Sequence, residues 1–246
     1  MKDSVVTISI ISHGQALIAR QLLGDLDKFC INARVILTYN LPEDEIPLSE
    51  SLASRTTVLR NPTPKGFGAN HNAAFMHCET PYFCILNPDI RFIENPYDAL
   101  IAAMEKFRWV ISSPMIFNPE GEIEDNCRVF PTPWGMILRK AGLVDGRWPY
   151  DSNEEKIEPH WIAGMFLLIK REHYVALSGF DERYFMYCED IDLCARTRKK
   201  GLGLGAITST RAVHNARRDS SKSYRYLRWH IASLIRFWAS NLGRLP

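Results

Sequence analysis

Residues 82–89 read Tyr-Phe-Cys-Ile-Leu-Asn-Pro-Asp, an apolar run that ends abruptly in a polar turn. This run predicts a strand at 82–86, and the β-branched run at 5–11 predicts a strand that is covered on both faces. The runs 5–11, 34–39 and 57–60 have the same apolar, β-branched character, and helical spacing follows the first of them. Strands and helices that alternate over short connections predict a parallel, right-handed β/α sheet.

Polar residues stand where three of these strands end. They are Ser12-His13, Asn40 and Asn87-Pro88-Asp89. The carboxyl ends of parallel strands meet at one edge of a sheet, and ligands of such sheets bind there. We therefore expect these three turns to form a ligand site.

The second half of the chain is less regular. Residues 118–160 are rich in Pro, Gly and acids, and we expect them to pass over the site as a long excursion. Apolar runs predict strands at 161–170, 202–208 and 211–214, and a helix is predicted at 190–200.

The length and composition are those of one globular domain. The chain has 246 residues, of which 46% are hydrophobic and 24% charged, which excludes a mainly disordered chain. Its six Cys form no C-x-x-C pair, so we expect reduced thiols in a cytoplasmic protein. No apolar run reaches the roughly 18 residues of a membrane span, and the N-terminus leads straight into a strand, so we expect neither a membrane helix nor a signal peptide.

Positive charge is concentrated near the C-terminus. Residues 211–246 hold eight Lys and Arg against one acid, whereas the rest of the chain has an acidic excess. This pattern predicts an anionic partner, either a phosphate-bearing ligand, an anionic lipid surface or a nucleic acid. A solvated helix face is the plainer alternative, and nucleic acid is the least favoured because no base-reading module is present.

An amphipathic helix is predicted in this basic segment. The apolar stripe that we expect to pack on the body consists of Tyr224, Leu227, Ile231, Leu234, Ile235 and Trp238. Trp229 and Phe237 lie off the stripe beside arginines, so we expect them to form an exposed face for an anionic membrane, with a second buried contact or a dimer interface as the alternative. We divide the chain into a domain at 1–215 and a basic helical extension at 216–246, packed on the same domain.

Carboxylates form two candidate groups. Asp89 leaves the carboxyl edge of the sheet, although Asn-Pro-Asp is also a common turn. Glu189, Asp190 and Asp192 open a predicted helix beside the aromatic segment 184–187. Capping explains part of this pattern, but three acids in four positions exceed what a cap requires. A carboxylate held against aromatic walls suits a general base.

Two further segments suit ligand binding. His214 closes a predicted strand just before Arg217 and Arg218, where it can reach a metal or a phosphate, with a structural histidine as the alternative. The Gly66-Phe67-Gly68 loop allows a ligand to approach the backbone closely. The phosphate-binding loop G-x-x-x-x-G-K-[ST] and the dinucleotide fingerprint G-x-G-x-x-G are both absent, which argues against a dehydrogenase.

Four segments, in order along the chain, together resemble the rhamnosyltransferase-like branch of the family-2 inverting glycosyltransferases. The most specific is 179–196, GFDERYFMYCEDIDLCAR, which is similar to the signature G-F-D-E-x-F-F-x-Y-x-E-D-x-D-x-x-x-R almost position for position. The others are the turn at 8–14, the segment 61–74 (NPTPKGFGANHNAA) and the turn at 87–89. The resemblance implies the GT-A fold, an α/β fold with a mostly parallel central sheet flanked by helices, here followed by the C-terminal amphipathic helix.

The resemblance also implies roles for the matching residues. Asp89 would bind a divalent cation, Mg²⁺ or Mn²⁺, and His214 would complete that site. Asp190 would be the base that deprotonates the acceptor hydroxyl, with Glu189 as the next candidate. The residues expected around the donor are Ser12, His13, Gly14, Asn40, Gly66, Asn72, Asn87, Asp89, Trp161, Gly164 and Arg218.

The implied activity is the transfer of a sugar, with rhamnose as a candidate, from a nucleotide-diphosphate donor to a hydroxyl of a growing polysaccharide or lipid-linked glycan. The resemblance implies metal-assisted single displacement in a cytoplasmic enzyme that can sit on the inner face of the membrane. A sugar nucleotidyltransferase is one alternative, although Ser12-His13-Gly14-Gln15 lacks the Arg and Lys that it would want after the first strand. A nucleotide-sugar or carbohydrate-binding module without turnover is the other.

Three positions depart from the family pattern. Asn87 replaces the first Asp of D-x-D, and His71 stands where many relatives have Arg. The end of the second strand, 37–41, lacks the usual Asp-Asn-x-Ser. These departures leave the metal ligands and the nucleotide base open.

Overall fold

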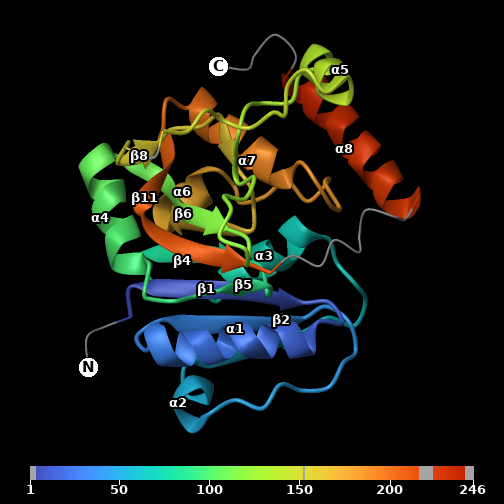
Figure 1. Ribbon diagram of the computed structural model, residues 1–246. Helices are drawn as coiled ribbons and strands as arrows, with labels where there is room; N and C mark the ends of the chain where they lie inside the picture. Colours follow the sequence, from blue (N-terminus) through green and yellow to red (C-terminus); the bar gives the residue numbers. More distant parts are fainter. Residues whose placement is uncertain (1–3, 152, 216–223, 242–246) are drawn as a thin grey trace.

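The computed structural model describes residues 4–151, 153–215 and 224–241 (Figure 1). Over these residues the chain forms a mixed sheet of nine strands in the order β3-β2-β1-β4-β10-β6-β11-β5, with β8 paired to β11. The strands of this sheet are β1 (Val6–Ser12), β2 (Arg34–Tyr39), β3 (Thr56–Arg60), β4 (Tyr82–Leu86), β5 (Ile90–Arg91), β6 (Trp109–Phe117), β8 (Lys156–Ile157), β10 (Phe166–Lys170) and β11 (Gly203–His214). A separate two-stranded sheet pairs β7 (Cys127–Arg128) with β9 (Trp161–Ile162).

Helices cover both faces of the large sheet (Figure 1). The helices are α1 (Ala16–Phe29), α2 (Glu50–Ala53), α3 (Phe67–Phe75), α4 (Tyr97–Phe107), α5 (Pro133–Lys140), α6 (Arg171–Ala176), α7 (Glu189–Lys199) and α8 (Tyr224–Asn241). Successive strand residues point to opposite faces. In β4, Cys84 therefore packs with the core under α1, whereas Phe83 packs with the core that includes α6 and α7. This explains why residues 82–86 are apolar without interruption.

The expectation of a parallel sheet is wrong for one central strand. β10 lies antiparallel between β4 and β6, whereas β1, β2, β3 and β4 are parallel to one another. The reason is the connection: β6 ends at Phe117 on the carboxyl edge, and β10 begins opposite Leu86, the last residue of β4, so the chain leaves and re-enters the sheet at the same edge. The strand predicted at 161–170 is also divided into β9 and β10, and the two strands predicted at 202–208 and 211–214 form the single irregular strand β11.

The C-terminal helix packs through a different face from the predicted one. Leu234 is buried as expected and Trp238 is partly buried, but Leu227, Ile231 and Ile235 are exposed. Phe237, expected on an exposed face, is fully buried and lies 6.1 Å from Phe130 between ring centroids. The helix is turned this way because Ser233 Oγ donates to Met186 O (2.9 Å) and Trp238 Nε1 to Pro131 O (2.7 Å). The side chain of Tyr224 lies outside what the structure describes.

Two predictions from composition can be compared with the structure. All six cysteines are buried and free, as expected for reduced thiols. Among the residues that the structure describes, no helix is both long and apolar enough to cross a bilayer.

Candidate active site

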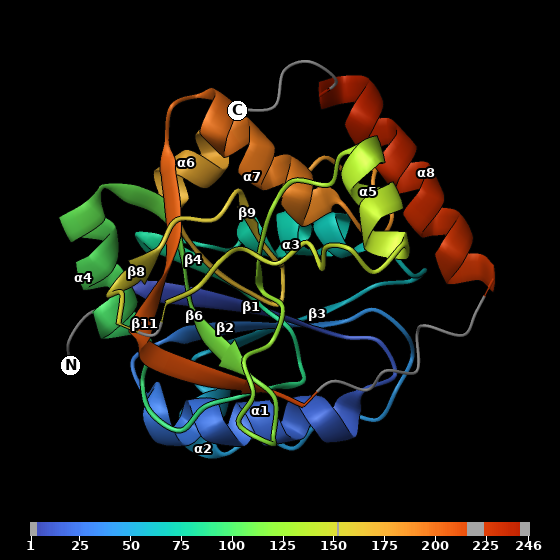
Figure 2. The same ribbon diagram turned by 45° about the horizontal axis from the view of Figure 1, so that its top comes forward.

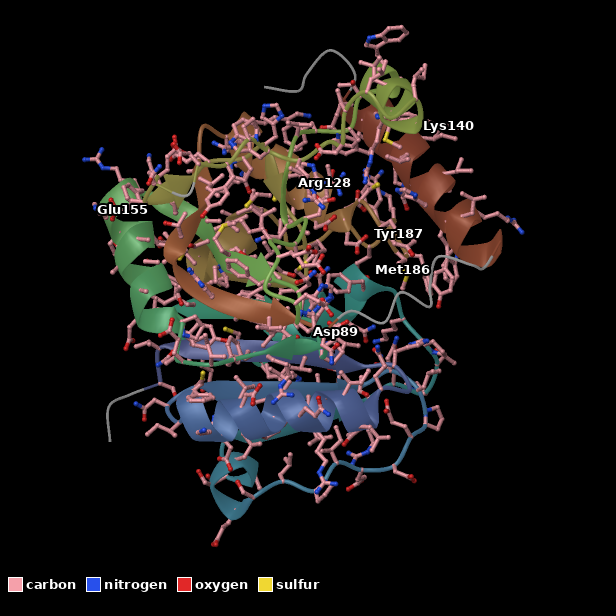
Figure 3. All side chains as sticks on the ribbon, in the orientation of Figure 1. Asp89, Arg128, Lys140, Glu155, Met186 and Tyr187 are labelled. Carbon is pink, nitrogen blue, oxygen red and sulfur yellow. The ribbon has the colours of Figure 1, made fainter. Side chains whose placement is uncertain are left out.

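A cavity of about 570 Å³ opens where β1, β2 and β4 end. The three predicted turns contribute His13, Asn40 and Asn87-Pro88-Asp89 to its wall. The prediction that these strand ends converge on one site is therefore confirmed. Asp89 and Met186, which both line the cavity, are labelled in Figure 3. The other lining residues include Lys65, Phe67, Asn70, His71, Phe185, Tyr226 and Trp229.

Asn40 holds the loop that leads into α3. Its Oδ1 accepts hydrogen bonds from Lys65 N (2.8 Å) and Asn61 Nδ2 (2.8 Å), and its Nδ2 donates to Lys65 O (3.0 Å). The same Nδ2 lies 2.9 Å from His13 Nδ1. Since Asn40 is buried and both of its amide atoms are engaged, it positions this wall of the cavity. Its predicted contact with a nucleoside stays a prediction.

His71, on α3, is fully buried beside the cavity. Its Nδ1 lies 2.8 Å from Ser9 Oγ, and its ring meets the Phe67 ring edge-on at 4.5 Å. Burial lowers the pKa of His71 to about 3, so the imidazole is neutral at pH 7. Where the family pattern has an arginine, this site thus holds an uncharged ring.

Asp89 and His214 meet at the carboxyl edge because β5 pairs antiparallel with the end of β11, which sets His214 opposite Ile90. His214 Nε2 lies 3.3 Å from Asp89 Oδ2. Burial acts to lower the pKa of His214, but the hydrogen bond and charge of Asp89 outweigh it and the pKa is raised. Asp89 Oδ1 and His214 Nδ1 are buried without a hydrogen-bond partner, so Asp89 Oδ1 has a lone pair to offer, and His214 Nδ1 offers one when the ring is neutral with its proton on Nε2. No cluster of three or more metal-ligating side chains occurs in the described part of the chain.

Glu189 and Asp190 begin α7 after a tight turn in which Tyr187 and Cys188 have φ of 70° and 65°. Asp190 Oδ2 accepts from Gly164 N (2.8 Å), and Oδ1 accepts from Ile191 N (2.8 Å). Burial raises the pKa of Asp190, although these backbone N–H groups oppose the rise. Burial, followed by the charge of Asp190, raises the pKa of Glu189 well above its usual range. The neutral form of Glu189 is therefore favoured by its surroundings, next to a carboxylate that two backbone N–H groups orient.

Asp190 lies one aromatic ring away from the cavity. A Cβ placed on Gly164 would lie 3.3 Å from the Phe67 ring and 3.4 Å from Asp190 Cβ. Phe67 itself lines the cavity. Asp190 and the cavity-lining ring of Phe67 therefore both lie against Gly164, which makes the oriented carboxylate a neighbour of the cavity wall.

Much of the segment 179–196 is engaged in positioning rather than in lining the cavity. Asn72 Oδ1 accepts from Tyr174 OH (2.7 Å) and Phe180 N (2.9 Å), and Asn72 Nδ2 donates to Phe180 O (2.9 Å). Further along, Arg196 forms an ion pair with Asp192 (2.7 Å). These bonds attach the turn that precedes Asp190 to α3 and α7. Asn72, expected at the nucleoside, thus faces this turn instead.

The comparisons with known proteins agree with this geometry. No family model matches the chain. The chain is 29% identical to rhamnosyltransferase WbbL of Escherichia coli over 247 residues, which is 96% of this chain and 93% of that protein. It is 32% identical over 143 residues to the N-acetylglucosaminyl-diphospho-decaprenol L-rhamnosyltransferase of Mycobacterium tuberculosis, covering 53% of this chain and 46% of that one. These similarities support a rhamnosyltransferase-like family-2 glycosyltransferase, and the chain is described below as a glycosyltransferase.

Solved structures place this glycosyltransferase in the GT-A fold. GalNAc-T7 with UDP, GalNAc and Mn²⁺ superposes with a TM-score of 0.67 at 17% identity, over 87% of this chain and 44% of that chain. The mannosyltransferase PcManGT of Pyrobaculum calidifontis, in complex with GDP-Man and Mn²⁺, has a TM-score of 0.60 at 14% identity, over 96% and 65% of the two chains. This glycosyltransferase thus spans about half the length of its mycobacterial relative and of GalNAc-T7.

Several predicted donor residues of this glycosyltransferase lie outside the cavity wall. Ser12 is buried and donates to Glu43 Oε2 (2.8 Å), and Gly14 N donates to Glu43 Oε1 (3.2 Å). Trp161 is buried, and its Nε1 donates to Val129 O (2.8 Å). Gly66 adjoins the wall, and a side chain there would collide with Phe185 O. Arg218 lies outside the described residues.

The sequence analysis of this glycosyltransferase missed one wall of the site. This wall consists of Phe185, Met186, Tyr226 and Trp229. The ring centroids of Phe185 and Trp229 lie 4.7 Å apart. The aromatic segment 184–187 was the available signal for the first two. The packing of α8 against that segment, which brings Trp229 to the cavity, has no local signal in the sequence.

Proposed function

We propose that this glycosyltransferase moves rhamnose from a nucleoside-diphosphate donor to a hydroxyl of a lipid-linked glycan, with inversion at the anomeric carbon. The observation that carries the proposal is the cavity that ends at Asp89 and His214 with Asp190 one ring away. Rhamnose is supported by the names of both relatives. A lipid-linked acceptor is supported by the name of the mycobacterial relative.

Asp89 and His214 are the residues that would hold a divalent cation. Their unpartnered buried atoms, Asp89 Oδ1 and His214 Nδ1, fit that function. Two protein ligands are enough for Mg²⁺ or Mn²⁺ in such a site, because Mg²⁺ is commonly bound by one or two carboxylates together with substrate phosphates and water. When bound, the cation neutralises charge on the departing diphosphate. Lys65 lines the same cavity and adds positive charge beside the donor.

Asp190 acts as the general base. Its carboxylate takes the proton of the acceptor hydroxyl while that oxygen forms a bond to the anomeric carbon. The bond from this carbon to the diphosphate oxygen breaks, and its electron pair leaves with the nucleoside diphosphate. A single displacement of this kind inverts the anomeric carbon, and no nucleophile of the protein is needed.

The environment of Asp190 suits this role. Burial raises its pKa, which makes the carboxylate a stronger base, although the backbone N–H groups of Gly164 and Ile191 oppose the rise. Gly164 N and Ile191 N occupy one lone pair on each oxygen, which orients the carboxylate and leaves further acceptor capacity for the hydroxyl.

A membrane surface is the second part of the proposal. α5 and α8 lie side by side in both ribbon views (Figures 1 and 2). Neither helix contains an acid, and both expose apolar and basic side chains. The apolar ones are Trp134, Ile137, Leu227, Ile231 and Ile235, and the basic ones are Arg139, Lys140, Arg228 and Arg236. Such a face is suited to an anionic bilayer, where each basic residue adds about 1 kcal/mol.

The test is release of nucleoside diphosphate from a panel of UDP-, dTDP- and GDP-sugars, with and without N-acetylglucosaminyl diphosphodecanol as acceptor. We expect acceptor-dependent release from a rhamnosyl donor and an anomeric configuration in the product opposite to that of the donor. Retention of configuration would refute the single displacement. Donor binding without turnover, with every donor and acceptor, would refute the enzyme and support a binding module.

A further inference from the structure

Three arginines gather around one half-buried carboxylate outside the cavity. Arg128 of β7 forms an ion pair with Asp125, while Arg139 Nη2 and Arg147 Nε each lie 4.0 Å from an Asp125 oxygen. We call Arg128, Arg139 and Arg147 the arginine cluster. Arg128 is 13% exposed, whereas Arg139 and Arg147 are 46% and 55% exposed. The cluster thus has one buried member and two that are open to a ligand.

The backbone forces these like charges together. Arg128 and Arg147 face each other across an antiparallel bridge, where like charges directly opposite one another are unfavourable. Gly146 turns the chain there with a φ of 79°, and a Cβ on it would lie 3.0 Å from Arg128 Nη2. Because Gly146 has no side chain, it leaves room for the guanidinium group of Arg128 beside that of Arg147.

Three guanidinium groups repel one another at this point. Asp125 is shared by all three arginines, and Asp145, which is largely exposed, reaches only Arg147 (3.8 Å). Burial lowers the pKa of Arg128, and the charges of Arg139 and Arg147 lower it further, although Asp125 and Asp190 oppose this. Burial also lowers the pKa of His230 on α8, and the charges of Arg139 and Arg128 add to that effect. An anion bound here would relieve this repulsion.

The cluster lies within electrostatic range of the base. The charge of Arg128 acts on Asp190, and its guanidinium lies 5.6 Å from the centre of the Trp161 ring. Arg139 sits in the last turn of α5, next to α8, on the face proposed for the membrane (Figure 2). Arg128 is labelled in Figure 3, in the part of the molecule that contains β7, α5 and α7. The cluster therefore connects the base to the exposed apolar face.

We propose that the arginine cluster binds the diphosphate of the lipid-linked acceptor, while the sugar next to that diphosphate presents its hydroxyl to Asp190. This rests on the proposed function. Guanidinium groups suit the ligand because their planar forks donate two parallel hydrogen bonds to phosphate oxygens. The lipid chain then continues toward Trp134 and Ile137, which are exposed on α5. Phosphate on a phospholipid headgroup shares this chemistry, and the experiment separates the two sources.

The experiment compares two acceptors in neutral detergent, N-acetylglucosaminyl diphosphodecanol and decyl N-acetylglucosaminide, which lacks phosphate. The full chain, the Arg139→Gln/Arg147→Gln variant and the control Arg34→Gln are measured. Arg34 lies on β2, outside the arginine cluster. Its side chain is 51% exposed and paired with Glu79, which is close to the 55% exposure of Arg147 and to its pairing with a carboxylate. Binding of the diphosphate acceptor is measured by calorimetry beside KM, so that the cluster is tested even without turnover.

We expect the double variant to raise the Kd and the KM for the diphosphate acceptor about tenfold or more, as for loss of charge-assisted contacts. Its KM for the phosphate-free acceptor, and all constants of Arg34→Gln, should stay within twofold. Equal loss on both acceptors, or no loss on either, would overturn the proposal. A loss that occurs only in anionic vesicles would assign the cluster to phospholipid headgroups and overturn it too. If the parent chain binds the diphosphate acceptor through the cluster but transfers no sugar, the proposed function fails and the binding site stands.

Discussion

Replacement of Asp190 by Asn tests the chemistry most directly. The side chain keeps its size, but the amide cannot take a proton from the acceptor hydroxyl. General-base catalysis contributes about 10²–10⁴-fold, so we expect kcat to fall by that factor. At 1.36 kcal/mol per tenfold, the barrier rises by about 2.7–5.4 kcal/mol.

The structure also sets the cost to folding. Each Asp190 oxygen accepts one backbone N–H, from Gly164 and from Ile191 (2.8 Å each), and Asn can satisfy only one of them. One buried N–H left without a partner costs about 1–3 kcal/mol, which the removal of a buried charge partly offsets. The variant therefore stays folded, and the loss of rate has to come from chemistry.

The assay combines steady-state transfer with calorimetric titration of the donor. We expect donor Kd to stay within about threefold, because the diphosphate end of the cavity is untouched. Asp192→Asn is the matched control: Asp192 is on the same helical turn and pairs with Arg196 (2.7 Å), so its loss should lower stability and leave kcat within about fivefold. Parent-like turnover by Asp190→Asn would refute the base assignment and direct attention to Glu189.

Three further predictions concern the cation, the buried acid and the membrane face. Asp89→Ala should weaken donor binding and abolish its response to added Mg²⁺ or Mn²⁺ in calorimetry; an unchanged metal response would exclude this ligand. Glu189→Gln should stabilise the fold increasingly as pH rises above about 4.3, the pKa of Glu in the unfolded chain. The reason is that the raised pKa of Glu189 in the folded protein makes its ionisation costly above that pH. A difference in urea midpoint between variant and parent that is the same at pH 5 and pH 8 would contradict this. Leu227→Ser/Ile231→Ser should reduce sedimentation with anionic vesicles severalfold. Leu17→Ser, which removes an exposed leucine from α1, should leave sedimentation unchanged; a double variant that sediments like the parent would refute the membrane face.

The sequence by itself determined the strands and the meeting of their ends. An apolar run such as 82–86 is costly anywhere except between two covered faces, and the polar turn after it has to lie at the sheet edge. Pocket residues His13, Asn40 and Asp89 were therefore predictable from local pattern alone. The segment 179–196 was recognisable by its resemblance to the family signature, and the structure gives several of its residues positioning contacts, such as the bond from Arg196 Nη2 to Gly179 O (2.9 Å).

Tertiary structure decided whatever depended on which surface a segment meets. β10 could run in either direction, because an apolar run has no polarity, and the return of the chain to the carboxyl edge before Phe166 made it antiparallel. Likewise α8 has apolar residues around much of its circumference, so periodicity could not choose between burying Phe237 and burying Ile231. The contact with Phe130 and the bond from Ser233 to Met186 made that choice. The arginine cluster arises in the same way, since its members are brought together only when residue 147 pairs with β7.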